Sequence, residues 1–150
     1  MILDAATTGT LEAALGAAME GEVRFDAASR AVYSSDASVY QILPTGVVVP
    51  RSASDVKATL RICREHGVPI TARGGGTSQC GQSIGEGIAL DFSKYMRRVL
   101  DLDLENRTVV VEPGMVLAEL NPCLWWGAIM LTAGVLFLVV PWWTERRRGG

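Results

Sequence analysis

Three consecutive glycines, Gly74, Gly75 and Gly76, constrain the fold of this chain more than any other feature of its sequence. Glycine reaches positive φ at little steric cost, and its lack of a side chain lets a ligand approach the backbone closely. Successive N–H groups in such a loop can converge into a concave anion-binding site. Arg73 before the run, with Thr77 and Ser78 after it, adds donors suited to phosphate oxygens. The pattern therefore indicates a cradle for a phosphorylated cofactor.

Two common phosphate-binding loops do not fit this stretch. A dinucleotide-binding turn requires G-x-G-x-x-G, and Gln79 stands where its last glycine belongs. A P-loop requires a lysine after its last glycine, and Gln82 occupies that position. A flexible surface loop without a ligand remains the alternative, and the flanking sequence argues against it.

The flanking sequence predicts a strand–helix–strand unit. Val47–Val49 is a short β-branched run, and Ser52 or Ser54 is suited to cap a following helix. Apolar residues with helical spacing continue to Cys63, and Gly67 is a typical helix stop. The next strand leads directly into the glycine run, so we expect parallel strands with the loop at a carboxyl end, where open α/β sheets bind ligands.

The remaining soluble part predicts scaffold elements. Thr10 is a candidate cap for a first amphipathic helix, and Ile88–Phe92 alternates as in a half-buried strand. Val99–Asp103 and Thr108–Glu112 flank a four-residue turn, which predicts a hairpin. The acids of this hairpin lack the turn glycine and distal glutamate of a calcium-binding loop, and the cysteines are widely spaced, so no metal site is predicted.

Several spaced motifs together resemble a known family. The motifs are Asp36–Tyr40, Pro44–Pro50, Arg73–Ser83, Gly87–Asp91 and Val111–Gly114. In this order they are similar to the start of the FAD-binding PCMH-type domain of the vanillyl-alcohol-oxidase-like flavoproteins. The first motif is most similar to the branch of D-lactate dehydrogenases and glycolate oxidase subunits. The resemblance extends over roughly residues 10–121.

The resemblance implies FAD as the cofactor and assigns its binding residues. They are Arg73, Gly74, Gly75, Gly76, Thr77, Ser78, Gly81, Gln82 and Ser83. Some relatives attach the flavin covalently through a histidine of this loop, and Thr77 stands at the matching position, which implies non-covalent FAD. His66 is the only histidine and lies at a predicted helix end, where a structural role is expected. No catalytic residue is assigned.

The implied function is FAD binding in an FAD-linked oxidoreductase that acts on a 2-hydroxy acid of the D-lactate or glycolate type. Family chains continue past Asn121 with more flavin-domain strands and a substrate domain, so a truncated or fused fragment is expected. The alternative is a non-catalytic membrane-tethered module or an inactive truncation product. A net charge of −2 provides no basic patch for nucleic acid.

The chain changes character at Pro122. Residues 124–143 are almost uniformly apolar, long enough to cross a bilayer as a helix, with a tryptophan pair at each end and three arginines beyond. We therefore expect two parts, a partial FAD-binding domain over residues 1–121 and a single-pass membrane segment with a basic tail over residues 122–150. The first twenty residues contain no basic region typical of a secretory signal, which favours a cytoplasmic flavin part. The expected fold class is α+β, a strand–helix–strand unit with mixed strands, followed by one transmembrane helix.

Overall fold

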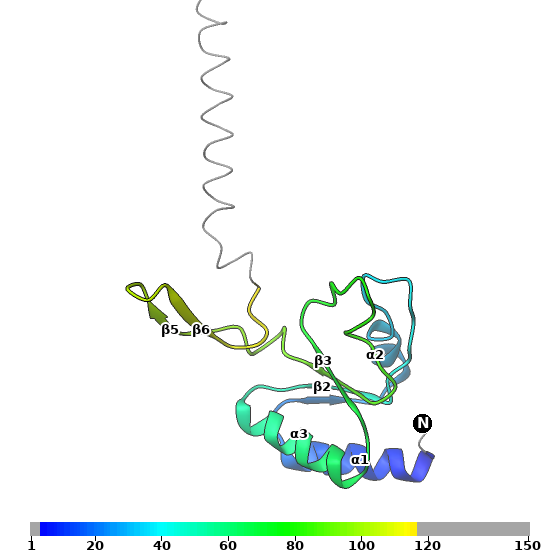
Figure 1. Ribbon diagram of the computed structural model, residues 1–150. Coiled ribbons are helices and arrows are strands. Elements are labelled where there is room, and N and C mark those ends of the chain that lie inside the picture. Colours follow the sequence, from blue (N-terminus) through cyan, green and yellow to red (C-terminus); the bar gives the residue numbers. More distant parts are fainter. Residues whose placement is uncertain (1–3, 117–150) are drawn as a thin grey trace, which may run out of the picture. The chain divides into compact units, whose positions relative to one another are not determined.

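The structure is a computed structural model that describes residues 4–116. Helices and strands alternate from α1 to β3, and three further strands follow (Figure 1). In chain order the elements are α1 (Ala5–Ala18), β1 (Glu22–Arg24), α2 (Ala27–Val32), β2 (Gly46–Val49), α3 (Ala53–Glu65), β3 (Ile70–Arg73), β4 (Ile88–Asp91), β5 (Val99–Asp103) and β6 (Thr108–Val111).

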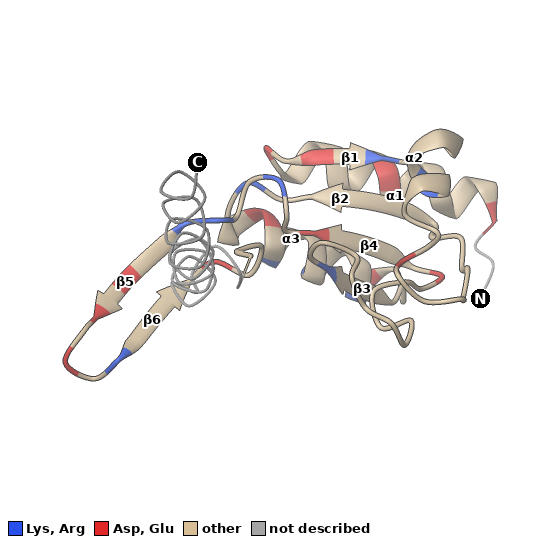
Figure 2. Cartoon of the chain, turned by 90° about the horizontal axis from the view of Figure 1, so that it is seen from above, with Lys and Arg blue, Asp and Glu red and all other residues tan. Residues whose placement is uncertain are grey.

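The first four strands form one sheet in the order β1-β2-β4-β3 (Figure 2). β2, β4 and β3 run parallel, and β1 runs antiparallel to β2. The predicted strand–helix–strand unit is present as β2–α3–β3, with both strands in the same direction. These two strands do not pair with each other, because β4 lies between them and pairs with both.

Each face of the sheet carries its own apolar cluster. α1 and α3 pack together below the sheet, and Leu11 and Leu15 of α1 meet Ile62 of α3 and the inward side chains of β2 and β4 there (Figure 1). The opposite face presents Val47, Val49 and Ala89, against which Tyr33 and Tyr95 pack. β4 is therefore buried on both faces rather than half-buried as its alternation predicted, as expected for a central strand of a parallel sheet.

Local signals account for the helix ends. Ser52 caps α3 by accepting a hydrogen bond from the Asp55 N–H, and the helix ends at His66 before Gly67, whose φ is 66°. Both ends agree with the prediction. The prediction for α1 was wrong at its start, because Asp4 is the cap and accepts from the Thr7 N–H at 2.6 Å. Thr10 lies inside the helix, where its hydroxyl donates to the Ala6 carbonyl.

β5 and β6 pair antiparallel and form the predicted hairpin. The turn contains Arg107 at φ 54°, and the Asp103 carboxylate accepts from the Asn106 N–H at 3.0 Å. At the base of the hairpin, Glu112 accepts from both the backbone and the guanidinium of Arg98. The Asp103 carboxylate thus forms a local hydrogen bond within the turn.

The expected fold class requires correction. Helices and strands alternate as far as β3, and β2, β4 and β3 are parallel, so the described fold is mixed α/β rather than α+β. Over residues 4–116, the structure contains no helix with both the length and the apolar character needed to span a bilayer. The stretch 124–143, on which the expectation of a transmembrane helix rested, lies outside the described residues.

Candidate functional site

The residues predicted to bind the cofactor all lie at one connection of the sheet. Arg73 ends β3, and residues 74–83 follow it as irregular turns before the chain reaches β4. Because β2, β3 and β4 are parallel, the start of this glycine loop (residues 74–83) lies at the carboxyl edge of the sheet. Gly76 at φ 67° and Gly81 at φ 77° adopt the left-handed conformation that the loop requires.

The glycine loop presents unpaired backbone donors. Among the described residues, none accepts a hydrogen bond from the consecutive N–H groups of Gly74 to Ser78. Gly74, Gly75 and Thr77 are exposed, so these donors are accessible to a ligand. A Cβ at Gly74 would meet no atom within 4 Å, and one at Gly75 would lie 3.6 Å from the Thr77 side chain. The start of the loop is therefore open and rich in donors, as an anion-binding backbone concavity requires.

Polar side chains of the loop bind within the protein. The Ser78 hydroxyl is hydrogen-bonded to the Gln82 side chain and accepts from the Gln82 N–H at 3.1 Å. Nη1 of Arg73 donates to the carbonyl oxygens of Ser35 at 2.9 Å and Ser83 at 3.3 Å. The donors that remain for an anion are thus largely those of the backbone, whereas the side chains of Arg73 and Ser78, which the sequence offered as additional donors, bind within the protein.

A second segment, the Ser34–Ile42 turn, lies against the loop. Its ends are held by the Ile42 N–H donating to the Ser34 carbonyl at 2.8 Å. Within it, the Ala37 N–H donates to the Gly76 carbonyl at 3.0 Å, and the Asp36 carboxylate accepts from the Ser83 hydroxyl at 2.9 Å. Both the early and the late part of the glycine loop are therefore attached to this turn.

Sequence reasoning noted the Asp36–Tyr40 motif as a point of resemblance but assigned it no place in the site. The Asp36 side chain accepts from the Ser38 N–H at 2.9 Å, an Asx turn that the Asp-x-Ser spacing could have indicated. Hydrogen bonds from Ser38 and Ser83 lower the pKa of Asp36 to about 2. Asp36 is therefore ionised at neutral pH, and its charge is held by these donors.

Tyr33 lies beneath the loop, at the end of α2. Its hydroxyl donates to the Asp91 carboxylate at the end of β4 at 2.5 Å, and the Arg73 guanidinium lies 5.1 Å from the ring centroid. Burial, together with the hydrogen bond to Asp91, raises the pKa of Tyr33 to about 12. The phenol therefore stays protonated and links the ends of β4 and α2 at all physiological pH values.

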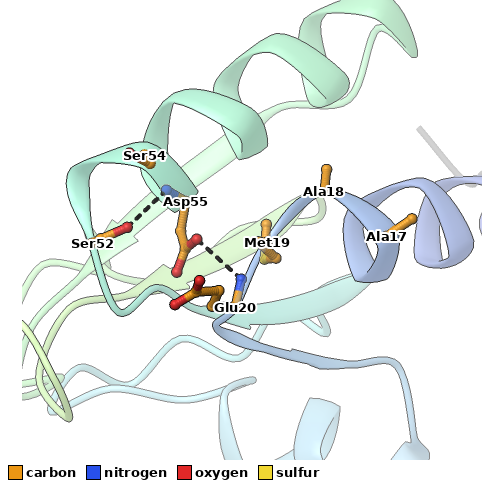
Figure 3. A pocket seen from close by; sticks show the side chains of 7 residues that line it. All are labelled: Ala17, Ala18, Met19, Glu20, Ser52, Ser54 and Asp55. Carbon is orange, nitrogen blue, oxygen red and sulfur yellow. Dashed lines mark hydrogen bonds between the residues drawn. The ribbon is translucent and has the colours of Figure 1, made fainter.

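A shallow groove of about 400 Å³ lies elsewhere, between the end of α1 and the start of α3 (Figure 3). Its floor includes Asp55, whose carboxylate accepts from the N–H groups of Glu20 and Arg51. These acceptors are thus used by the protein itself. Over residues 4–116, the side chains of His, Cys, Asp and Glu form no cluster of three suited to a metal ion. The glycine loop remains the stronger candidate site.

The described loop suits a phosphorylated cofactor on three grounds. Its unpaired N–H groups are consecutive, its glycines leave space for close approach, and it starts at the carboxyl edge of parallel strands. This combination defines a dinucleotide-cofactor domain of α/β type. The FAD binding domain family matches residues 44–135, more than half of the chain, and the chain belongs to that family. FAD is accordingly its cofactor.

Two curated relatives are similar to this chain in sequence. D-2-hydroxyglutarate dehydrogenase of Pantoea ananatis is 41% identical over 104 residues, which cover 67% of this chain and 10% of the relative. Glycolate oxidase subunit GlcD of Bacillus subtilis is 41% identical over 95 residues, which cover 62% of this chain and 20% of the relative. The chain thus spans about a tenth to a fifth of the length of the curated relatives it matches.

Solved structures agree on the fold. 4-Ethylphenol oxidase from Gulosibacter chungangensis superposes with a TM-score of 0.61 at 26% identity, over 75% of this chain and 23% of that protein. The BBE-like 1 protein of Physcomitrella patens superposes with a TM-score of 0.63 at 20% identity, over 78% of this chain and 26% of that protein. The resemblance to the FAD-binding PCMH-type family, drawn from the motifs alone, is confirmed.

Proposed function

We propose that this chain provides the pyrophosphate-binding part of the FAD site in an FAD-linked oxidoreductase acting on a 2-hydroxy acid. The observation that carries the proposal is the row of unpaired N–H groups from Gly74 to Ser78 within the described residues. The substrate class is supported by the names of the relatives, which act on D-2-hydroxyglutarate, glycolate or D-lactate. When bound, FAD supplies the redox chemistry, and the protein supplies binding and orientation.

Within this proposal the backbone does most of the binding. The N–H groups of Gly74 to Ser78 donate to the anionic oxygens, and charge-assisted hydrogen bonds of this kind are stronger than neutral ones. The second half of the loop contributes indirectly, because the contacts of Gly81, Gln82 and Ser83 determine its shape. The Ser34–Ile42 turn supports both halves.

The proposed attachment of FAD is non-covalent. Thr77 has no nucleophilic nitrogen, and His66 lies at the C-terminus of α3, before the start of β3, whereas the glycine loop follows the end of that strand. Acid precipitation of the FAD-loaded chain should therefore release all flavin into the supernatant. Yellow colour retained in the pellet would overturn the non-covalent assignment.

The binding proposal is tested by FAD titration of the purified chain, followed by flavin fluorescence. Gly75→Val places a branched side chain beside the N–H groups at a position where a Cβ meets no backbone atom within 4 Å, so the fold should tolerate it. Loss of charge-assisted contacts worth about 1.5–3 kcal/mol should raise Kd by at least tenfold. Gly16→Ala on the exposed side of α1 is the matched control, because a Cβ there meets nothing within 4 Å.

Equal Kd values for wild type and Gly75→Val would contradict the role of the loop. A wild-type chain that remains folded by circular dichroism but does not quench flavin fluorescence would contradict the proposal as a whole.

A further inference from the structure

We infer that Arg73 is a positioning residue that fixes the shape of the glycine loop, and that it does not itself bind the phosphates. This inference rests on the proposed FAD site and concerns how that site is held. Arginine at the entrance of a phosphate loop would ordinarily be taken as a phosphate ligand. The contacts of Arg73 point to a different use.

Both hydrogens of one guanidinium nitrogen are already used. Nη1 carries two N–H groups, and it donates to the carbonyl oxygens of Ser35 and Ser83. Ser35 belongs to the Ser34–Ile42 turn, and Ser83 ends the glycine loop. One nitrogen of Arg73 therefore joins these two segments to the end of β3.

The rest of the guanidinium lies beside two residues of the protein, Gly76 and Tyr33. A Cβ built on Gly76 would lie 2.5 Å from Nη2 and 2.9 Å from the central carbon of Arg73, so the group lies directly against this glycine. On another side it stacks near the Tyr33 ring, at 5.1 Å from the centroid. Tyr33 is in turn fixed by its hydrogen bond to Asp91. The guanidinium thus contacts Gly76 of the loop and lies near the Tyr33 ring.

Two further hydrogen bonds depend on the same arrangement. The Ala37 N–H donates to the Gly76 carbonyl, and the Ser83 hydroxyl donates to the Asp36 carboxylate, so the turn and the loop are joined at two further points. With Arg73 in place, the Gly76 carbonyl faces the turn, and the N–H groups from Gly74 to Ser78 stay unpaired among the described residues.

The inference is tested first on the FAD-free chain by hydrogen exchange of the Ala37 amide. Arg73→Gln and Arg73→Lys both remove the pair of carbonyl contacts. Both should therefore speed the exchange of the Ala37 amide about tenfold, because at least one charged hydrogen bond is lost. Arg61→Gln on the exposed face of α3, where Arg61 pairs with Glu65, is the matched control and should leave the exchange unchanged. Unchanged exchange at Ala37 in both Arg73 variants would overturn the inference.

FAD titration at several salt concentrations then separates positioning from direct binding. If Arg73 positions the loop, Lys and Gln should weaken FAD binding about equally, and the salt dependence of Kd should match that of wild type. If Arg73 binds phosphate, Lys should retain most of the affinity and Gln should reduce the salt dependence. The second pattern would overturn the inference.

A measurement on the unmodified chain covers the case in which the variants do not fold. FAD should shift the amide NMR signals of Gly74 to Ser78 and leave the guanidinium signals of Arg73 without a new slowly exchanging N–H. A new protected guanidinium N–H on FAD addition would overturn the inference. If FAD shifts no signal at all, the proposed function fails, while accelerated Ala37 exchange in the variants would still show that Arg73 holds the loop.

Discussion

Gly75 and Gly76 are neighbours with different requirements. Gly76 has φ 67°, and a Cβ there would collide with the Arg73 guanidinium. Gly75 is not in the left-handed region, and a Cβ there finds ordinary contact distance. The sequence alone treats the three glycines as equivalent, and the prediction for this loop attributed positive φ to Gly75 as well.

Gly76→Ala should therefore destabilise the chain, because a non-glycine residue held at positive φ costs about 1–3 kcal/mol. Gly75→Ala should change the free energy of unfolding by no more than about 0.5 kcal/mol, as surface substitutions usually do. Urea unfolding followed by circular dichroism measures both. Equal effects of the two substitutions would contradict the difference in backbone conformation.

Asp36 gives the loop a pH dependence. Its pKa is lowered from 3.8 to about 2 by the donors of Ser38 and Ser83, so the folded state binds its proton less readily than the unfolded state. The stabilisation is therefore complete above the unfolded pKa near 4 and is lost as the pH falls towards 2.

Wild type should lose thermal stability between pH 4 and pH 2 more steeply than Asp36→Asn, which retains an acceptor for the Ser38 N–H but has no charge to protonate. The measurement is the difference in Tm between the two proteins across this range. Glu22 also has a pKa lowered to about 2, by Lys94 and Tyr95, and it contributes to the wild-type curve in the same pH range. The test therefore uses the Tm difference between wild type and Asp36→Asn at each pH. Parallel curves would contradict a role for the Asp36 charge.

At the scale of elements, the Asp55 carboxylate connects α1, β2 and α3. The carboxylate lies in the first turn of α3 and accepts from the Glu20 N–H, just after α1, at 3.2 Å (Figure 3). It also accepts from the Arg51 N–H, just after β2, at 2.8 Å. The side chain is buried, with 4% of its surface exposed. The start of α3, the end of α1 and the end of β2 are thus held together by one carboxylate.

Asp55→Ala should leave two N–H groups without their acceptor and lower the free energy of unfolding by about 1–3 kcal/mol. Ser54→Ala, one residue earlier on the exposed side of the same turn, is the matched control and should have little effect. Urea midpoints compared at constant slope provide the measurement. A loss no larger than that of the control would show that water replaces the carboxylate at no cost.

Elements whose signals are local were predictable. Ser52 and Gly67 fixed both ends of α3, and the four residues 104–107 placed the hairpin turn correctly. Features that depend on pairing between strands distant in sequence were not predictable. β4 alternates in sequence, yet it is buried on both faces because its neighbours in the sheet are β2 and β3.

The candidate site was predictable to the same degree. The glycine run and its place after a strand follow from the sequence. Its support by the Ser34–Ile42 turn depends on contacts between distant residues, such as Asp36 with Ser83, which are 47 positions apart. The internal use of Arg73 likewise depends on Ser35, a residue with no marked sequence signal.

At the scale of the whole molecule, FAD binding should be linked to folding. A ligand that binds only the folded state at 100 times its Kd stabilises that state by about 2.7 kcal/mol. FAD should therefore raise the Tm of the wild-type chain in a concentration-dependent manner and raise the Tm of Gly75→Val less at the same FAD concentration. An equal rise in both proteins would indicate binding outside the glycine loop.

The position of β4 also determines when the parallel sheet can fold during synthesis of the chain. β2, α3 and β3 emerge from the ribosome first, but the strand that must lie between β2 and β3 is synthesised after the whole glycine loop. Until residues 88–91 are released, β2 and β3 have no shared partner, and closing the intervening loop costs entropy without the reward of pairing. A nascent chain stalled before Ile88 should therefore be cleaved rapidly by protease. The cofactor loop consequently takes shape only at the step that completes the parallel sheet.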